Sequence, residues 1–131
     1  MIYVDSCIPM YLIGAEHPNK KRVIEMVSQF LQAGDTLATS AEAFQEIIHR
    51  YLAIKNPKHL NAAYEALEEM VSLTGEITKK DTDMARNLSF QYSELSSRDC
   101  LHVAVMKRIQ CDKIWTFDEG FDAVSSIQRV A

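Results

Sequence analysis

Residues 2–6 read Ile-Tyr-Val-Asp-Ser, an apolar strand of three residues that runs directly into a carboxylate. A strand that is apolar at consecutive positions is typical of a parallel sheet covered on both faces. In such sheets, ligands bind beyond the carboxyl ends of the strands. Asp5 therefore has two explanations: it caps a helix that begins near Ser6, or it belongs to a binding site at the sheet edge.

Further strands and helices are predicted along the rest of the chain. Runs of strand composition bounded by turn signals cover residues 36–39, 113–116 and 127–130. A weaker strand is predicted at 76–78, directly after Gly75. Apolar residues at three- and four-residue steps predict helices over 41–54, 57–73, 81–92 and 97–109. Strands that alternate with helices predict an α/β domain with a mostly parallel sheet.

Length and composition set the class of protein. The chain has 131 residues, 47% hydrophobic and 24% charged, which suits one globular domain over 1–131. No apolar run reaches the roughly 18 residues of a membrane helix, and no secretory signal is recognised, so a cytoplasmic protein is expected. The net charge is −4, so contact with nucleic acid requires a local basic patch or a metal.

Cysteine, histidine and glycine form no recognisable catalytic motif. The three cysteines lack CxxC spacing, and Cys7 and Cys100 are expected to be small buried side chains. The four histidines show no HExxH or paired ligand spacing, and His102 is expected to be a hydrogen-bonded helix residue rather than a catalyst. The four glycines form neither GxGxxG nor a P-loop. The acidic residues are therefore the candidates for chemistry.

Two acidic residues have a purely structural explanation. Residues 39–42 (TSAE) and 78–81 (TKKD) match the capping box, so the start of a helix accounts for Glu42 and Asp81. Glu46 lies one turn further into its helix, directly before Ile47 and Ile48, and has no such role. A solvated face remains the alternative for Glu46.

Asp99 and Asp118 are open to both explanations. Asp99 stands three residues after Ser96, as in a capping box, but it begins a nearly all-apolar helix that should pack on the sheet. Asp118 directly follows the strand at 113–116 and could cap a short helix. Because Asp5 and Asp118 both leave strand ends, their joint arrangement predicts a cluster at one edge of the sheet.

Clustered carboxylates predict a cation. They repel one another and raise each other's pKa unless a positive charge lies among them. Oxygen ligands suit Mg²⁺ or Mn²⁺ rather than zinc. Such a site can polarise a phosphodiester and lower the pKa of a bound water. The residues thus predict metal-assisted phosphodiester hydrolysis at Asp5, Glu46, Asp99 and Asp118.

Four blocks of sequence, in this order, resemble PIN-domain proteins, specifically the VapC-type toxins of bacterial and archaeal toxin–antitoxin pairs. They are IYVDS at 2–6, TSAEAFQEI at 39–47, LSSRDCLHVAV at 95–105 and WTFDEGFDAV at 115–124. The resemblance covers essentially the whole chain. It implies a PIN-like three-layer α/β/α fold, with a central parallel sheet of about five strands and helices on both faces.

The resemblance also implies a function. It implies a Mg²⁺- or Mn²⁺-dependent endoribonuclease that cleaves RNA, forms a homodimer and is inhibited by a small cognate antitoxin. The catalytic and metal-binding acids it implies are Asp5, Glu46, Asp99 and Asp118. The supporting hydroxyls it implies are Ser6 and Thr116. Glu119 and Asp122 stand close to Asp118 in the sequence and are possible assistants to it.

Two alternatives remain open at this point. One keeps the PIN fold but assigns it to RNA processing or RNA binding outside toxin–antitoxin systems. The other is a phosphoacceptor receiver domain, which pairs two acids after its first strand and places a lysine after a later one. Here Asp5 is followed by Ser6 and Cys7, which argues against a receiver domain.

Overall fold

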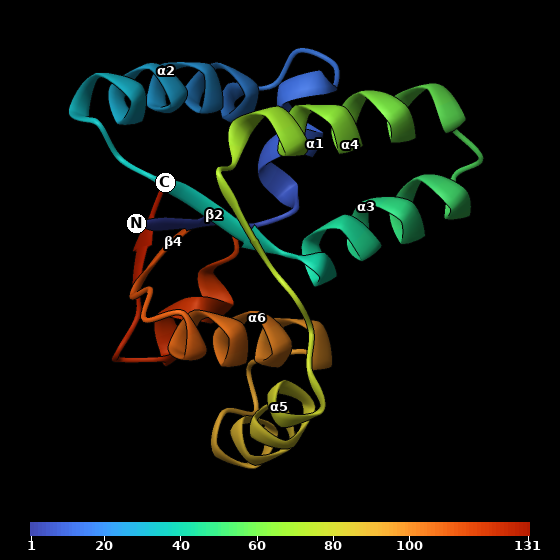
Figure 1. The fold of residues 1–131 in the computed structure, drawn as a ribbon. Helices are drawn as coiled ribbons and strands as arrows, with labels where there is room; N and C mark the ends of the chain where they lie inside the picture. Colours follow the sequence, from blue (N-terminus) through green and yellow to red (C-terminus); the bar gives the residue numbers. More distant parts are fainter.

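The computed structural model describes all residues, 1–131, and its centre is a five-stranded sheet with helices on both faces (Figure 1). The strands are β1 (Ile2–Val4), β2 (Leu37–Ser40), β3 (Leu73–Gly75), β4 (Lys113–Trp115) and β5 (Gln128–Val130). Their order is β3-β2-β1-β4-β5, and every neighbouring pair is parallel. The predicted fold class is confirmed. The order also differs from the 2-1-3-4-5 order of receiver domains, which excludes that alternative.

The helices form two layers, one on each side of the sheet (Figure 1). One layer contains α1 (Cys7–Ile13), α2 (Pro18–Ala33), α3 (Ala41–Ala53) and α4 (Pro57–Met70). The other contains α5 (Lys79–Gln91), α6 (Ser97–Arg108) and the 3₁₀ helix η1 (Glu119–Ala123). None of these helices combines the length and the apolar composition needed to cross a membrane.

Strand β1 belongs to both cores because successive side chains of a strand point to opposite faces. Ile2 and Val4 pack with α1 to α4, whereas Tyr3 packs with α5 and α6. All three side chains are buried. This explains the uninterrupted apolar run before Asp5: the strand is central, and neither of its faces meets solvent.

The strand predicted at 76–78 is wrong. The observed strand β3 precedes it, and 76–78 is the loop that leads into α5. Gly75 is the last residue of β3 and does not form a turn that precedes the strand. A Cβ at Gly75 would lie only 3.0 Å from the Cγ1 of Val105. The glycine thus permits close packing of β3 against α6. Helix α2 was not predicted at all, whereas the four predicted helices are present with ends shifted by up to three residues.

The capping box predicted at 39–42 is also wrong. Thr39 lies inside β2, fully buried, and its hydroxyl donates to the carbonyl of Val4 at 2.8 Å. Ser40 occupies the N-cap position of α3, without a side-chain hydrogen bond to the helix. Thr39 therefore joins β2 to β1, and Glu42 loses the capping role that the sequence suggested.

The capping box at Asp81 is confirmed. The Thr78 side chain and the Asp81 carboxylate satisfy each other's backbone N–H groups at the start of α5. Asp81 is buried and also accepts two hydrogen bonds from Arg108 of α6, from Nε at 3.0 Å and from Nη2 at 3.1 Å. These contacts join α5 to α6 and account for Asp81 without any catalytic role.

Candidate metal centre and active site

The predicted acids come from four different elements that meet at one edge of the sheet. Asp5 follows β1, and its N–H donates to Trp115 of the adjacent β4 at 3.1 Å. Asp118 lies shortly after β4, Glu46 lies on α3 and Asp99 lies in the first turn of α6. All four acids line one pocket of about 360 Å³, which is called the acidic pocket below.

Two buried residues, Thr116 and Ser6, connect three of these acids. Thr116 donates to Oδ2 of Asp5 at 2.6 Å and accepts the N–H of Asp118 at 3.0 Å. The Ser6 N–H donates to Oδ1 of Asp5 at 2.7 Å, and the Ser6 hydroxyl donates to Oε2 of Glu46 at 2.7 Å. Helix α1 has no side-chain cap. The Asp5 carboxylate therefore serves the contacts of the pocket and does not cap this helix.

Asp99 and Asp118 serve as helix caps and line the acidic pocket at the same time. Asp99 accepts the N–H of Ser96 at 3.2 Å through Oδ2, within a complete capping box. Asp118 accepts the N–H of Gly120 at 2.9 Å through Oδ1. Each carboxylate uses one oxygen in its cap, and neither second oxygen has a hydrogen bond. Each residue therefore caps a helix and also lines the pocket, so the cap alone does not account for its position.

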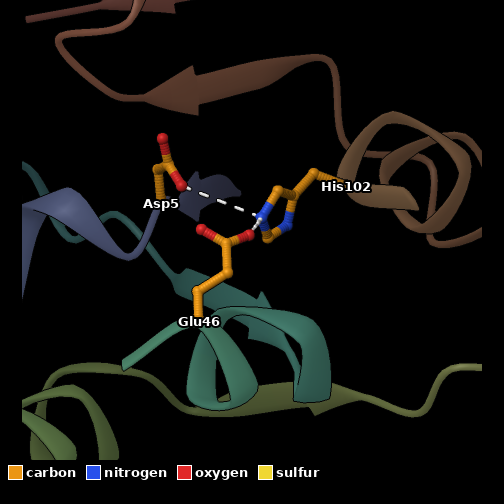
Figure 2. Close-up of side chains that lie close together, drawn as sticks. All are labelled: Asp5, Glu46 and His102. Carbon is orange, nitrogen blue, oxygen red and sulfur yellow. Dashed lines mark hydrogen bonds and ion pairs between the residues drawn. The ribbon is translucent and has the colours of Figure 1, made fainter. Parts of the chain in front are cut away.

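A histidine that the sequence did not assign to the site lies among the acids (Figure 2). The His102 side chain is fully buried, and its Nε2 hydrogen-bonds to Oε1 of Glu46 and lies 3.8 Å from Oδ1 of Asp5. Its Nδ1 lies 2.6 Å from the Tyr3 hydroxyl, which lies 2.6 Å from Oγ of Ser40. His102 is hydrogen-bonded, as expected, but its partners are residues of the site.

The charge state of this group follows from its neighbours. Burial acts to lower the pKa of His102, but Tyr3, Glu46 and Asp5 outweigh it and raise the pKa well above its usual value. Burial acts to raise the pKa of Glu46, but the hydrogen bond and charge of His102 outweigh it and lower that pKa. Each partner therefore favours the charged form of the other. Because both ring nitrogens have partners, His102 positions Glu46 rather than binding a metal.

The donor set of the acidic pocket fits a hard divalent cation. Asp5, Glu46, Asp99 and Asp118 all line this pocket, and atoms of Asp5 and Glu46 lie within 4.8 Å of each other. Burial raises the pKa of Asp99, and the negative charges of Asp118 and Asp5 raise it further, as expected where carboxylates crowd together without a cation. Carboxylate oxygens are the ligands that Mg²⁺ and Mn²⁺ prefer.

The one thiol in the acidic pocket is unsuited to chemistry. Burial and the negative charge of Asp5 raise the pKa of Cys7 to about 12. A thiol that stays protonated at neutral pH is a poor nucleophile and a poor metal ligand. The pocket therefore offers carboxylates and hydroxyls, but no activated cysteine.

The remaining acids of these segments lie outside the acidic pocket. Asp122 is held by Arg129, through hydrogen bonds of 2.9 and 3.0 Å to its two carboxylate oxygens. Neither Asp122 nor Glu119 lines the pocket with Asp118. Glu42 does not line it either; burial and the charge of nearby Glu46 raise the pKa of Glu42, and His102 opposes this.

Comparisons with known proteins find relatives that match essentially the whole chain. The family model of the PIN domain matches residues 2–127. Ribonuclease VapC13 of Mycobacterium tuberculosis is 42% identical over 131 residues, which cover 100% of both chains. Among solved structures, the sarcin-ricin loop cleaving toxin VapC20 of the same organism has a TM-score of 0.72 at 20% identity, over 94% of each chain. A toxin–antitoxin complex from Klebsiella pneumoniae has a TM-score of 0.68 at 14% identity, over 100% of this chain and 97% of the other.

Proposed function

This chain belongs to the PIN-domain family and to its VapC ribonucleases, and on that premise we propose that it is a metal-dependent endoribonuclease and the toxin of a toxin–antitoxin pair. The observation that carries the proposal is the meeting of four carboxylates in one pocket beyond the carboxyl ends of β1 and β4. A pocket of several carboxylates suits hydrolysis by a water molecule that a bound cation activates. Residues 1–131 form one nuclease domain in this proposal.

The cation of this site is Mg²⁺ or Mn²⁺, and its ligands, directly or through water, are Asp5, Glu46, Asp99 and Asp118. When bound, such a cation neutralises charge on a phosphodiester and lowers the pKa of a water molecule. The support for this set is chemical: the donors are carboxylate oxygens, and one oxygen of Asp99 and one of Asp118 have no hydrogen bond within the chain.

The other residues of the site keep the carboxylates in place. Thr116 and Ser6 fix the two oxygens of Asp5, and Ser6 also holds Glu46. His102 holds the second oxygen of Glu46 and is itself held by the Tyr3 hydroxyl. A reacting group that is held by its neighbours before the substrate arrives does not have to be ordered during the reaction.

The proposed partners are a small cognate antitoxin and a second copy of the chain, in the cytoplasm where RNA is available. An apolar groove of about 380 Å³ between α2 and α4 supports a protein partner, since it is lined by Ile24 and Leu31, which are 49% and 69% exposed. The acidic pocket and the net charge of −4 suit a basic inhibitory segment. Co-expression with a candidate antitoxin, followed by size-exclusion chromatography, tests both partners.

The substitution Asp5→Asn tests the nuclease. We expect hydrolysis of RNA in the presence of Mn²⁺ or Mg²⁺ to fall to background, because the substitution removes charge from the residue at the centre of the site. EDTA should abolish hydrolysis by the unmodified protein. The matched control is Asp35→Asn, an exposed residue before the amino end of β2, which should keep full activity. Full activity of a folded Asp5→Asn variant would refute the proposed mechanism.

A further inference from the structure

A second hollow opens directly beside the acidic pocket. It measures about 500 Å³ and is lined by Arg50 of α3 and Arg98 of α6, and also by Glu46, Asp99 and Asp118. The same three acids line the acidic pocket, so the two hollows share a wall. The second hollow, called the arginine pocket below, thus places two guanidinium groups next to the proposed reaction centre.

The two arginines have no partner of their own within the chain. Arg22, Arg108 and Arg129 each form an ion pair with a carboxylate. Arg50 and Arg98 form no ion pair and no side-chain hydrogen bond, although acids line the same hollow. Both side chains are exposed. Their donor groups therefore remain available to a ligand.

These guanidinium groups resolve an electrostatic difficulty of the proposed function. The chain carries a net charge of −4, and four carboxylates gather where a phosphodiester must enter. A polyanion binds such a surface only through local positive charge. The charge of Arg98 is close enough to Glu46 and Glu42 to act on the pKa of both carboxylates, which places it beside the acids.

We propose that the arginine pocket is a subsite for the RNA backbone, in which Arg50 and Arg98 bind phosphates next to the one that is cleaved. The proposal rests on the proposed ribonuclease function. Guanidinium groups match phosphate oxygens with two parallel hydrogen bonds, and their charge does not depend on pH. The two arginines come from α3 and α6, so a strand bound between them lies over both walls of the site.

The test compares the double variant Arg50→Gln/Arg98→Gln with the unmodified protein. A fluorescein-labelled single-stranded RNA is titrated in EDTA over a series of salt concentrations, with anisotropy as the readout. The logarithm of the binding constant K falls linearly with log[salt]. Replacing each arginine that binds a phosphate should make this slope less steep by about 0.7. In Mn²⁺-dependent hydrolysis, KM should rise about 10- to 100-fold while kcat stays within about threefold.

Two controls separate this subsite from general electrostatics. Arg86→Gln removes an exposed arginine of α5 that forms no ion pair, and it should leave both the slope and KM unchanged. The variant Arg50→Lys/Arg98→Lys keeps the charge and should restore the slope, but not all of the affinity. A double Gln variant that matches the unmodified protein or Arg86→Gln in slope and KM overturns the subsite.

The two proposals fail in different ways. If the unmodified protein hydrolyses no RNA with any divalent cation, the nuclease function fails, whereas binding in EDTA still reports on the arginines. If hydrolysis is normal and the double Gln variant keeps its slope and KM, only the subsite fails. Circular dichroism of each variant establishes that both comparisons are made on folded protein.

Discussion

Thr116 offers a sharp test of how the site is held together. Its hydroxyl donates to Oδ2 of Asp5 at 2.6 Å and accepts the Asp118 N–H at 3.0 Å, and the side chain is fully buried. Thr116→Val keeps the shape and removes the hydroxyl. A hydrogen bond to a charged group, such as the one removed here, is worth about 1.5–3 kcal/mol. Because Asp118 is exposed and water can replace the hydroxyl as its partner, we expect a total decrease of about 2–3 kcal/mol in unfolding free energy.

The same substitution should weaken metal binding. Without the hydroxyl, Oδ2 of Asp5 keeps only a distant contact to the Cys7 thiol. The carboxylate is then held mainly through Oδ1, which accepts the Ser6 N–H and lies 3.8 Å from Nε2 of His102. Loss of a hydrogen bond that orients a metal ligand typically lowers metal affinity or activity about 10- to 100-fold. The assays are urea denaturation in EDTA and titration with Mn²⁺, in which electron paramagnetic resonance reports the free ion.

The matched variant Thr116→Ser separates the hydroxyl from packing. It keeps the hydroxyl and removes one methyl group, at a cost of about 0.8 kcal/mol. We expect Thr116→Ser to bind Mn²⁺ as the unmodified protein does, and Thr116→Val to bind it far more weakly. If both variants bind Mn²⁺ equally, whether tightly or weakly, the hydroxyl does not orient Asp5 and the reasoning is refuted.

Three further substitutions test the roles given to the acidic residues. Glu46→Gln should reduce RNA hydrolysis strongly, whereas Glu42→Gln should change it little. Glu42→Gln should lower the unfolding free energy by about 0.5 kcal/mol or less, since only a helix-dipole contribution is removed. If Glu42→Gln abolishes hydrolysis and Glu46→Gln does not, Glu42 and not Glu46 belongs to the reaction centre. Asp81→Asn should cost about 2–3 kcal/mol in urea denaturation, less than a fully buried pair because the Arg108 side chain is 39% exposed. Its hydrolysis per folded molecule should be unchanged, and a variant as stable as the unmodified protein would contradict the structural role given to Asp81.

The strands β1, β2, β4 and β5, and the acids that follow β1 and β4, could be predicted because their signal is local. An apolar run on consecutive positions before Asp5 indicates a central parallel strand, and an acid after such a strand lies at the ligand-binding edge. Helix α3 was predicted from apolar spacing, so Glu46 could be placed near the border of its buried face. By contrast, α2 went unrecognised, since its buried residues Val23 and Met26 are few among polar neighbours.

The errors concern residues whose role depends on a partner far away in the sequence. Thr39 matches a capping box locally, but the carbonyl of Val4 on the neighbouring strand takes its hydroxyl. Gly75 looks like a turn, but its small size serves the contact with α6. His102 stands one helical turn after Asp99, and this three-residue spacing was the only signal that both share a face. Nothing in the sequence around it indicated the contact with Tyr3.

The strand order determines when the proposed ligands can come together during synthesis of the chain. Strand β1 lies at the centre of the sheet, but its neighbour β4 follows it in the chain only after β2, β3 and six helices. A nascent chain carries Asp5 and Glu46 long before Asp99 and Asp118 exist, and one edge of β1 stays unpaired until β4 emerges. Pairing between such distant segments is slow, because a long loop must close before any contact forms. A nascent chain that ends before α6 therefore lacks Asp99 and Asp118, and the proposed ligand set is complete only after both have been synthesised.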